Sequence, residues 1–189
     1  MSGLILLGIV VAAFIYGIML YNGLVNLKHG VARSWANIDV LLKQRHDEIP
    51  KLVEVCRQYQ QFEQATLERV IAARSRVSSA REKQDMNALG NAEADLRTGV
   101  GQIFAVAEAY PELKTNEHFM QLQARISGLE SAIADRRELY NDEVNINNVR
   151  IEQFPDVIIA RMFHFEEKPL LEFSVAEKTD VDMKALFNH

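Results

Sequence analysis

The sequence predicts an all-α protein in which an N-terminal transmembrane helix is continuous with an antiparallel four-helix bundle. Three observations lead to this prediction. The chain contains no charged residue and no histidine before Lys28. Beyond that point, apolar residues recur every three or four positions, which is the period of an amphipathic helix, and no segment alternates as a half-buried strand would. Short connections separate these long segments, and such connections favour antiparallel packing of neighbouring helices.

Residues 3–24 form the predicted transmembrane helix, within an anchor segment at 1–27. A bilayer core ~30 Å thick needs about 20 apolar residues in helical form, and this segment supplies them. No other part of the chain is apolar enough on all sides to enclose it as a core helix. A cleaved signal peptide is a further alternative, because Val11-Ala12-Ala13 resembles a cleavage site. However, the apolar run continues beyond these residues and no basic residue precedes it. We therefore expect an uncleaved anchor.

The residues that flank the anchor predict its orientation. Four basic residues follow the span within about 20 positions, whereas only the α-amino group precedes it. Basic residues favour the cytoplasmic side, so we expect the N-terminus outside and the bundle in the cytoplasm. The four residues are Lys28, Arg33, Lys43 and Arg45. Lys28 and Arg33 are also candidate contacts for lipid headgroups at the membrane surface.

One face of the predicted span consists of small residues. Gly8, Ala12, Ala13 and Gly17 lie on it at four- or five-residue spacing. Small side chains allow two membrane helices to approach closely. This stripe is therefore a candidate face for self-association, although glycine is common in membrane helices in any case.

Four helices are predicted between residues 28 and 155. The apolar period continues without a gap from the span, so we expect the membrane helix to run directly into the first bundle helix. A break is predicted near 47–50, because Pro50 disfavours helix in the residue before it and Asp47 can cap the next helix. The second helix follows this break and is expected to end near Lys83 or Gln84.

The third and fourth helices are separated by a Tyr-Pro connection. The third is predicted at 86–110, where glycines each cost about 1 kcal/mol relative to alanine but allow close helix packing. These glycines are Gly90, Gly99 and Gly101. Thr115 or Asn116 can cap the fourth helix, which stays in register to Phe154 and is stopped by Pro155.

The chain after the bundle, at 156–189, is predicted to be a partly docked extension. We expect a short helix at 157–165. Three apolar residues after it can dock on the bundle, namely Leu170, Leu171 and Phe173. Beyond Ser174 we expect a weakly ordered acidic end.

Composition and motif spacing indicate neither an enzyme nor a protein with a cofactor or a metal. No two of the five histidines have the i, i+4 spacing that places two metal ligands on one helix face. They are His29, His46, His118, His164 and His189. A single cysteine, Cys56, excludes a disulfide and a thiolate-rich zinc site within one chain, and we expect it in the core. Motifs of nucleotide-binding proteins and serine hydrolases are missing. A net charge of −5 gives no reason to expect nucleic-acid binding.

Two sets of charged residues have alternative interpretations. Glu63 and Glu108 lie near apolar stripes, where facing carboxylates can bind a di-iron centre, but the Glu-x-x-His pairs of such centres are missing. Basic residues cluster at the end of the second helix, namely Arg74, Arg76, Arg81 and Lys83. They either oppose the negative end of the helix dipole or bind an acidic partner or lipid headgroups.

Specific motifs lie on the predicted helices. They include Tyr21-Asn22-x-Leu24-Val25, Ile38-Asp39-Val40-x-Leu42-x-x-Arg45, Ile49-Pro50-x-Leu52-Val53, Ala73-Arg74, Glu108-x-Tyr110-Pro111-x-Leu113-Lys114-x-Asn116, Arg136-Arg137, Tyr140-Asn141 and Phe154-Pro155. Together these motifs resemble the LemA family of bacterial membrane-anchored helical proteins over nearly the whole chain. The chain departs from the family pattern at Lys51, where asparagine is common, and at His164, where glycine is common.

The resemblance implies a short extracytoplasmic N-terminus, one helix through the bacterial inner membrane and a cytoplasmic four-helix bundle. This agrees with the orientation that the flanking charges predict. The resemblance implies no activity, because the family has no established biochemical function and no accepted catalytic residues.

The polar motif residues are expected at or beside the seams between helices. If buried, such groups must be hydrogen-bonded, so we interpret them as inter-helix polar locks, with a binding surface as the alternative. They are Asn22, Arg45, Glu63, Glu108, Arg137, Asn141 and Asn147. The Tyr110-Pro111 connection and the predicted break before Pro50 are expected at the same end of the bundle, where they could form a joint partner site.

The leading functional hypothesis is a membrane-anchored scaffold or adaptor that binds lipid and a protein partner, or a self-assembling membrane protein. This hypothesis predicts an exposed apolar or charge-complementary patch. The alternative is a bundle that binds a small ligand or a metal, or an enzyme, and it predicts an interior cavity with convergent polar residues.

Overall fold

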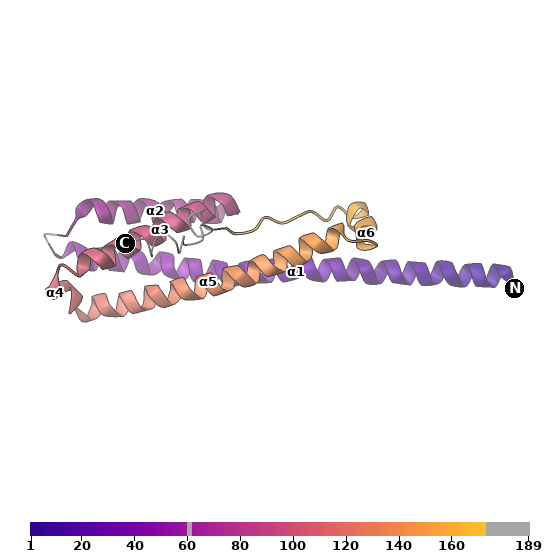
Figure 1. Ribbon diagram of the computed structural model, residues 1–189, viewed down its shortest axis with the longest axis horizontal. Coiled ribbons are helices and arrows are strands. Elements are labelled where there is room, and N and C mark those ends of the chain that lie inside the picture. Colours follow the sequence, from indigo (N-terminus) through magenta and orange to yellow (C-terminus); the bar gives the residue numbers. More distant parts are fainter. Residues whose placement is uncertain (60–61, 173–189) are drawn as a thin grey trace, which may run out of the picture. The chain divides into compact units, whose positions relative to one another are not determined.

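A computed structural model describes residues 1–59 and 62–172 of the chain, and within them every regular element is a helix. The elements are α1 (Ser2–Arg57), α2 (Gln64–Glu82), α3 (Met86–Ala107), α4 (Pro111–Lys114), α5 (Glu117–Glu152) and α6 (Asp156–Met162) (Figure 1). The predicted all-α class, with a long apolar helix at the N-terminus, is confirmed. The short helix predicted after Pro155 is also present, as α6.

The described chain forms two compact units, and both α1 and α5 contribute to each of them. Unit 1 contains Met1–Leu41 and Ala132–Leu170. Unit 2 contains Leu42–Ser131 and, of the described residues further along the chain, Leu171 and Glu172. The two units are described separately below.

Helix α1 continues for 56 residues and includes Pro50, so the predicted break near 47–50 is wrong. A proline inside a helix has no amide to donate to the carbonyl four residues earlier. Here that carbonyl, His46 O, accepts a hydrogen bond of 2.9 Å from Arg74 Nε in α2. A side chain from another helix therefore satisfies the carbonyl group, and the helix ends only at Arg57.

Unit 2 is built from α2, α3, α4, the last part of α1 and the first part of α5. Gly99 of α3 lies so close to α2 that an added Cβ would stand 2.9 Å from Val70 Cγ2. The predicted close packing at Gly99 is thus confirmed, whereas a Cβ at Gly101 would meet nothing within 4 Å. The phenyl rings of Phe104 in α3 and Phe119 in α5 are 6.2 Å apart, at an interplanar angle of 85°.

Unit 1 pairs α1 with α5 in antiparallel directions (Figure 1). Leu24 of α1 shares a buried apolar cluster with Ile151 of α5. Further along α1, the ring of Trp35 lies 6.0 Å from that of Tyr140. Later residues of α1 therefore meet earlier residues of α5, and the C-terminal end of α5 lies level with Leu24.

Side chains and backbone geometry set the helix ends. Asn116 caps α5, as predicted, because its Oδ1 accepts a 3.1 Å bond from the amide of Phe119. Two residues just after helices have positive φ, namely Gln84 at 53° and His164 at 55°. After α6, the amide of Phe165 donates to Ala160 O at 2.9 Å, which is the 6→1 bond of a Schellman motif. Glycine suits this left-handed position best, so His164 adopts a backbone conformation that is rare for residues with a side chain.

The segment after α6 lies against α5 in unit 1. Asn148 Nδ2 donates to Lys168 O and Asn148 Oδ1 accepts from Lys168 N, both at 2.9 Å. The hydroxyl of Tyr140 donates to Pro169 O at 3.0 Å. Of the residues predicted to dock, Leu171 is fully buried and Leu170 is 39% exposed. Phe173 and the predicted acidic end lie outside the described residues.

Candidate functional site

The most unusual chemical feature of unit 2 is an ion pair in its interior. Arg45 of α1 and Glu93 of α3 are only 3% and 2% exposed, and Arg45 Nη2 donates to Glu93 Oε2. Breaking a buried pair by removing one partner costs roughly 3–5 kcal/mol, because the other charge is left uncompensated. Loss of either partner alone is therefore expected to destabilise the contact between α1 and α3.

A third charged residue, Glu130 of α5, joins this pair. Burial raises the pKa of the Glu130 carboxyl, and the nearby positive charges of Arg45 and Arg97 offset part of that effect. Three buried atoms of the cluster have no hydrogen-bond partner among the described residues: Arg45 Nε, Glu93 Oε1 and Glu130 Oε1. We call Arg45, Glu93 and Glu130 the charge cluster.

The motifs of the sequence predict only one member of the charge cluster, although the helical period carries a signal for the other two. Arg45 was expected as a polar lock, but Glu93 and Glu130 were not. Each lies where the helical period requires an apolar residue: Glu93 falls four after Leu89, and Glu130 falls four after Ile126. A charge on the apolar stripe of three separate helices indicates that the three meet.

A groove on the surface of unit 2 lies between α1 and α5. It has a volume of about 680 Å³ and is open to solvent. The carboxylate of Glu48, which is buried, accepts from Lys51 Nζ at 2.9 Å and pairs with Arg125 Nε at 2.8 Å. The other lining residues are Val55, His118, Gln121, Leu122 and Ala124. Apolar side chains flanked by an excess of cations thus line this groove, which we call the α1–α5 groove.

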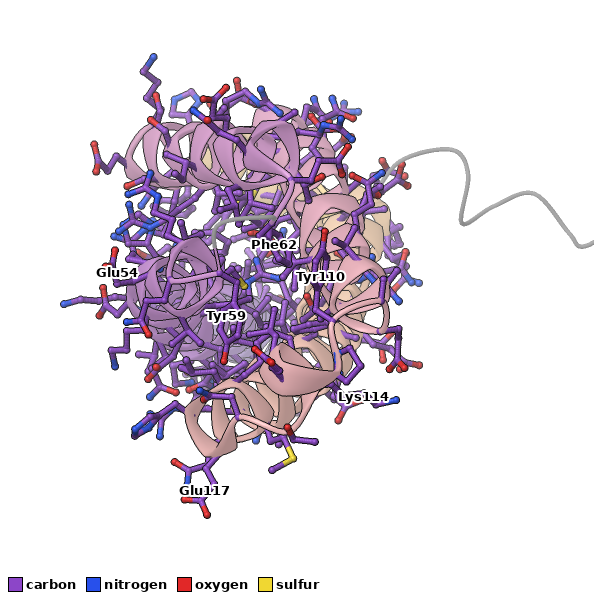
Figure 2. All side chains as sticks on the ribbon, turned by 90° about the vertical axis from the view of Figure 1, so that its left-hand side faces the viewer. Glu54, Tyr59, Phe62, Tyr110, Lys114 and Glu117 are labelled. Carbon is purple, nitrogen blue, oxygen red and sulfur yellow. The ribbon has the colours of Figure 1, made fainter. Side chains whose placement is uncertain are left out.

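The end of unit 2 near the α1–α2 turn is closed by aromatic side chains. Figure 2 shows Tyr59, Phe62 and Tyr110 gathered in the middle of this end, whereas Glu54, Lys114 and Glu117 lie around its rim. The rings of Phe62 and Tyr110 are 6.0 Å apart. The hydroxyl of Tyr59 accepts from Asn116 Nδ2 at 3.3 Å and donates to Glu112 O at 3.4 Å. The Tyr110-Pro111 connection therefore contacts the turn that follows Arg57, at the end of α1.

Metal-binding residues do not gather anywhere in the described ranges 1–59 and 62–172 in a group of three that could hold an ion. His29, His118 and His164 are exposed, while burial and the charge of Arg74 lower the pKa of His46. His189 lies outside the described residues. Cys56 is fully buried, as predicted for a core residue, and burial raises the pKa of its thiol to about 12.

Comparison with known proteins decides the family. The family model described as LemA matches residues 34–184, which is most of the chain. This chain belongs to the LemA family. Two curated relatives, the magnetosome proteins MamQ 1 and MamQ 2 of Paramagnetospirillum magneticum (strain ATCC 700264 / AMB-1), are each 30% identical over 88 residues. The match covers 43% of this LemA chain and 32% of each relative, so it spans about a third of the magnetosome proteins.

The motif residues of this LemA chain have different environments. Glu63 and Glu108 are exposed and interact with residues close in sequence: Glu63 accepts from the hydroxyl of Thr66 at 2.8 Å, and Glu108 pairs with Lys114. Asn22 is exposed. Asn147 is buried and donates to Asn148 Oδ1 at 3.1 Å, so it supports the contact of α5 with the segment after α6. Arg137 and Asn141 are half-buried and have interaction partners.

The basic cluster of the LemA chain is largely engaged in packing α2. Arg74 donates to His46 O, as described above, and Arg76 Nη2 lies 2.7 Å from Asp95 Oδ2 in α3. Arg81 also has an interaction partner, and Lys83 is exposed at the C-terminal end of α2. Two of the four basic residues therefore contact neighbouring helices rather than a helix terminus.

The residues expected at or in the membrane lie on the outside of unit 1. Lys28 and Arg33 are exposed. Ala12 and Ala13 are exposed as well, and a Cβ added at Gly8 or Gly17 would meet nothing within 4 Å. Among the described residues, α1 is the one helix long and apolar enough to cross a membrane. These features agree with a membrane-associated helical protein.

Proposed function

We propose that this LemA protein is a single-pass scaffold of the bacterial inner membrane, with its N-terminus outside and unit 2 in the cytoplasm, where it binds a protein partner. The observation that carries the proposal is the continuity of α1. The apolar segment and the helix that supplies Arg45 and Glu48 are one element, with no linker between them. The outward-facing apolar residues of its first part support a lipid environment, and Lys28 and Arg33 support the orientation.

The α1–α5 groove is the surface that we propose for the partner. Val55, Leu122 and Ala124 supply apolar contact, and Lys51 and Arg125 supply positive charge at the edge. This composition fits a protein segment with apolar side chains and an acidic flank, since complementary charge gives specificity and apolar contact gives affinity.

Photo-crosslinking in native membranes tests the proposed groove. A photoreactive phenylalanine analogue replaces Lys51 or Gln121 in the groove, and Glu68, an exposed residue of α2, in the control. We expect one protein to be captured from both groove positions and not from the control. We also expect Arg125→Glu to abolish the capture, because it reverses the charge at the groove edge. Equal capture from all three positions, or none, would exclude the groove as the partner site.

Self-assembly through the small residues of the span is a second candidate, supported by the open space at Gly8 and Gly17. A close helix pair would be disrupted by a large side chain at Gly17. We therefore expect Gly17→Ile to reduce the oligomer size in detergent. An unchanged size would count against self-assembly through this face.

A ligand-binding bundle remains the rival proposal, and the unpartnered atoms of the charge cluster support it. It predicts that native mass spectrometry of the purified protein detects a bound small molecule or ion, which Glu93→Gln removes. A bare protein mass would count against the rival.

A further inference from the structure

Helix α6 presents an apolar face that the rest of unit 1 does not cover. Ile158 and Met162 of α6 are four residues apart and are 56% and 59% exposed, and Phe154, which precedes the helix, is 81% exposed. Residues at this spacing lie on one side of a helix. The opposite side of α6 carries Asp156 and Ala160, which are buried. Helix α6 therefore exposes the apolar Ile158 and Met162 on its outer side, whereas its packed side carries the charged Asp156 as well as Ala160.

The position of α6 along α1 is fixed by contacts within unit 1. Ala160 of α6 shares a buried apolar cluster with Leu24 of α1. Just beyond α6, the ring of Phe163 lies 4.7 Å from that of Tyr21, and the ring of Phe165 lies 6.0 Å from it. Helix α6 is thus level with 21–24, at the end of the uncharged stretch of the chain.

The first basic residue of α1 lies just beyond the level of α6, on the side away from the predicted span. Lys28 is the first charged side chain of the sequence and lies four residues after Leu24, which is about 6 Å along a helix. Lys28 and Lys168 line a polar pocket of about 470 Å³ together with Tyr21, His29, His164 and Glu166. Cations and aromatic rings at this depth are typical of the boundary between acyl chains and headgroups.

We propose that α6 is a second membrane contact, which lies in the bilayer interface with its outer apolar face inserted among the lipids. Interfacial helices bury such a face by ~5–10 Å while their polar groups stay at the headgroup level. The lipid surface is the occupant that the structure favours, because α6 and the residues just after it pack beside Tyr21 and Leu24, at the end of the apolar part of α1. The inference rests on the proposed crossing of the membrane by α1.

Depth measurement by electron paramagnetic resonance tests this inference in the full chain, reconstituted in phospholipid vesicles. Spin labels are attached to Ile158→Cys and, separately, to Met162→Cys. The native Cys56 is fully buried, so the unmodified protein serves as the blank. We expect both labels to be more accessible to oxygen, which concentrates in the acyl region, than to a water-soluble nickel complex.

Two controls make the result unambiguous. Leu139 of α5 is 49% exposed, similar to Ile158, but lies roughly 20 Å further from the end of α5, so Leu139→Cys should face water. Ile9 lies in the apolar part of α1, so Ile9→Cys should face lipid. Labels at Ile158→Cys that behave like those at Leu139→Cys, or that both reagents fail to reach because a protein covers them, would overturn the inference. An aqueous label at Ile9→Cys would instead refute the crossing by α1.

Discussion

At the scale of single residues, Pro50 and Arg74 show how a local rule is overridden by a distant side chain. Pro50 leaves the carbonyl of His46 without its usual helical donor. Arg74, 28 residues along the chain, donates to this carbonyl at 2.9 Å. The two residues are therefore coupled through the His46 carbonyl, although they lie far apart in the sequence.

Substitution of both residues tests this pairing. Arg74→Met should lower the free energy of unfolding by about 1–3 kcal/mol, because the His46 carbonyl loses its partner inside the protein. The same substitution should cost less in a Pro50→Ala background, since that change restores a helical amide. Chemical denaturation in detergent, followed by circular dichroism, measures both values. Arg69→Met, which removes an exposed bond to Gln102, is the control on the same helix. Equal costs in both backgrounds would contradict the pairing.

Glu130 should make stability depend on pH. Burial raises the pKa of its carboxyl above 4.5 in the folded chain, so folding favours the protonated form. Stability from this group is complete below the unfolded pKa and is lost as the pH rises through the folded pKa. We therefore expect Glu130→Gln to raise the free energy of unfolding at neutral pH and to have little effect at acidic pH.

Urea denaturation across this pH range measures the effect, with Glu54→Gln as a control for an exposed carboxyl of unit 2. A loss of stability at neutral pH in Glu130→Gln would show instead that the ionised carboxylate stabilises the charge cluster.

At the scale of the helices, two glycines of α3, Gly99 and Gly101, should respond in opposite ways to alanine. Alanine gains roughly 1 kcal/mol over glycine inside a helix. Gly101→Ala should show this gain, because the space around it is open. Gly99→Ala should lower stability instead, by about 1–3 kcal/mol, since the new methyl group meets Val70 at 2.9 Å. Thermal unfolding of the two variants compares them directly, and equal shifts would contradict the close contact between α2 and α3.

The helices were predictable where a signal lies within the segment itself. The apolar period predicts the position of each long helix, and Asn116 has the side chain that a helix start requires. The end of the first helix was not predictable from the same information. Pro50 is a helix breaker by local rules, and its tolerance depends on Arg74 of the following helix. Contacts between helices are not encoded in any one segment.

The same distinction applies to the charge cluster. Arg45 was selected by its motif, but its partner Glu93 lies 48 residues away. The position of Glu93 on an apolar stripe shows that it is buried and does not show which cation it meets. The contact between Asn148 and Lys168 was not predictable for the same reason. Asn148 binds backbone atoms of a segment that has no helical period.

At the scale of the whole molecule, the chain combines features of a membrane protein and of a soluble bundle in one element. Helix α1 begins with exposed apolar residues and ends with residues that are buried in unit 2, such as Leu52 and Cys56. Exposure of the apolar side chains of the first part to water would be unfavourable. The apolar side chains of the last part are instead buried among other side chains of unit 2. The proposed membrane anchor therefore requires that the two ends of α1 lie in different environments.

Thiol labelling in intact bacterial cells tests this requirement most directly. A membrane-impermeant maleimide is applied to Ser2→Cys and to Lys83→Cys, and the unmodified chain is the blank because its Cys56 thiol is buried. We predict that Ser2→Cys reacts in intact cells and that Lys83→Cys reacts only after the membrane is permeabilised. Labelling of both positions from the same side of the membrane would contradict a single-pass anchor and, with it, the proposed scaffold.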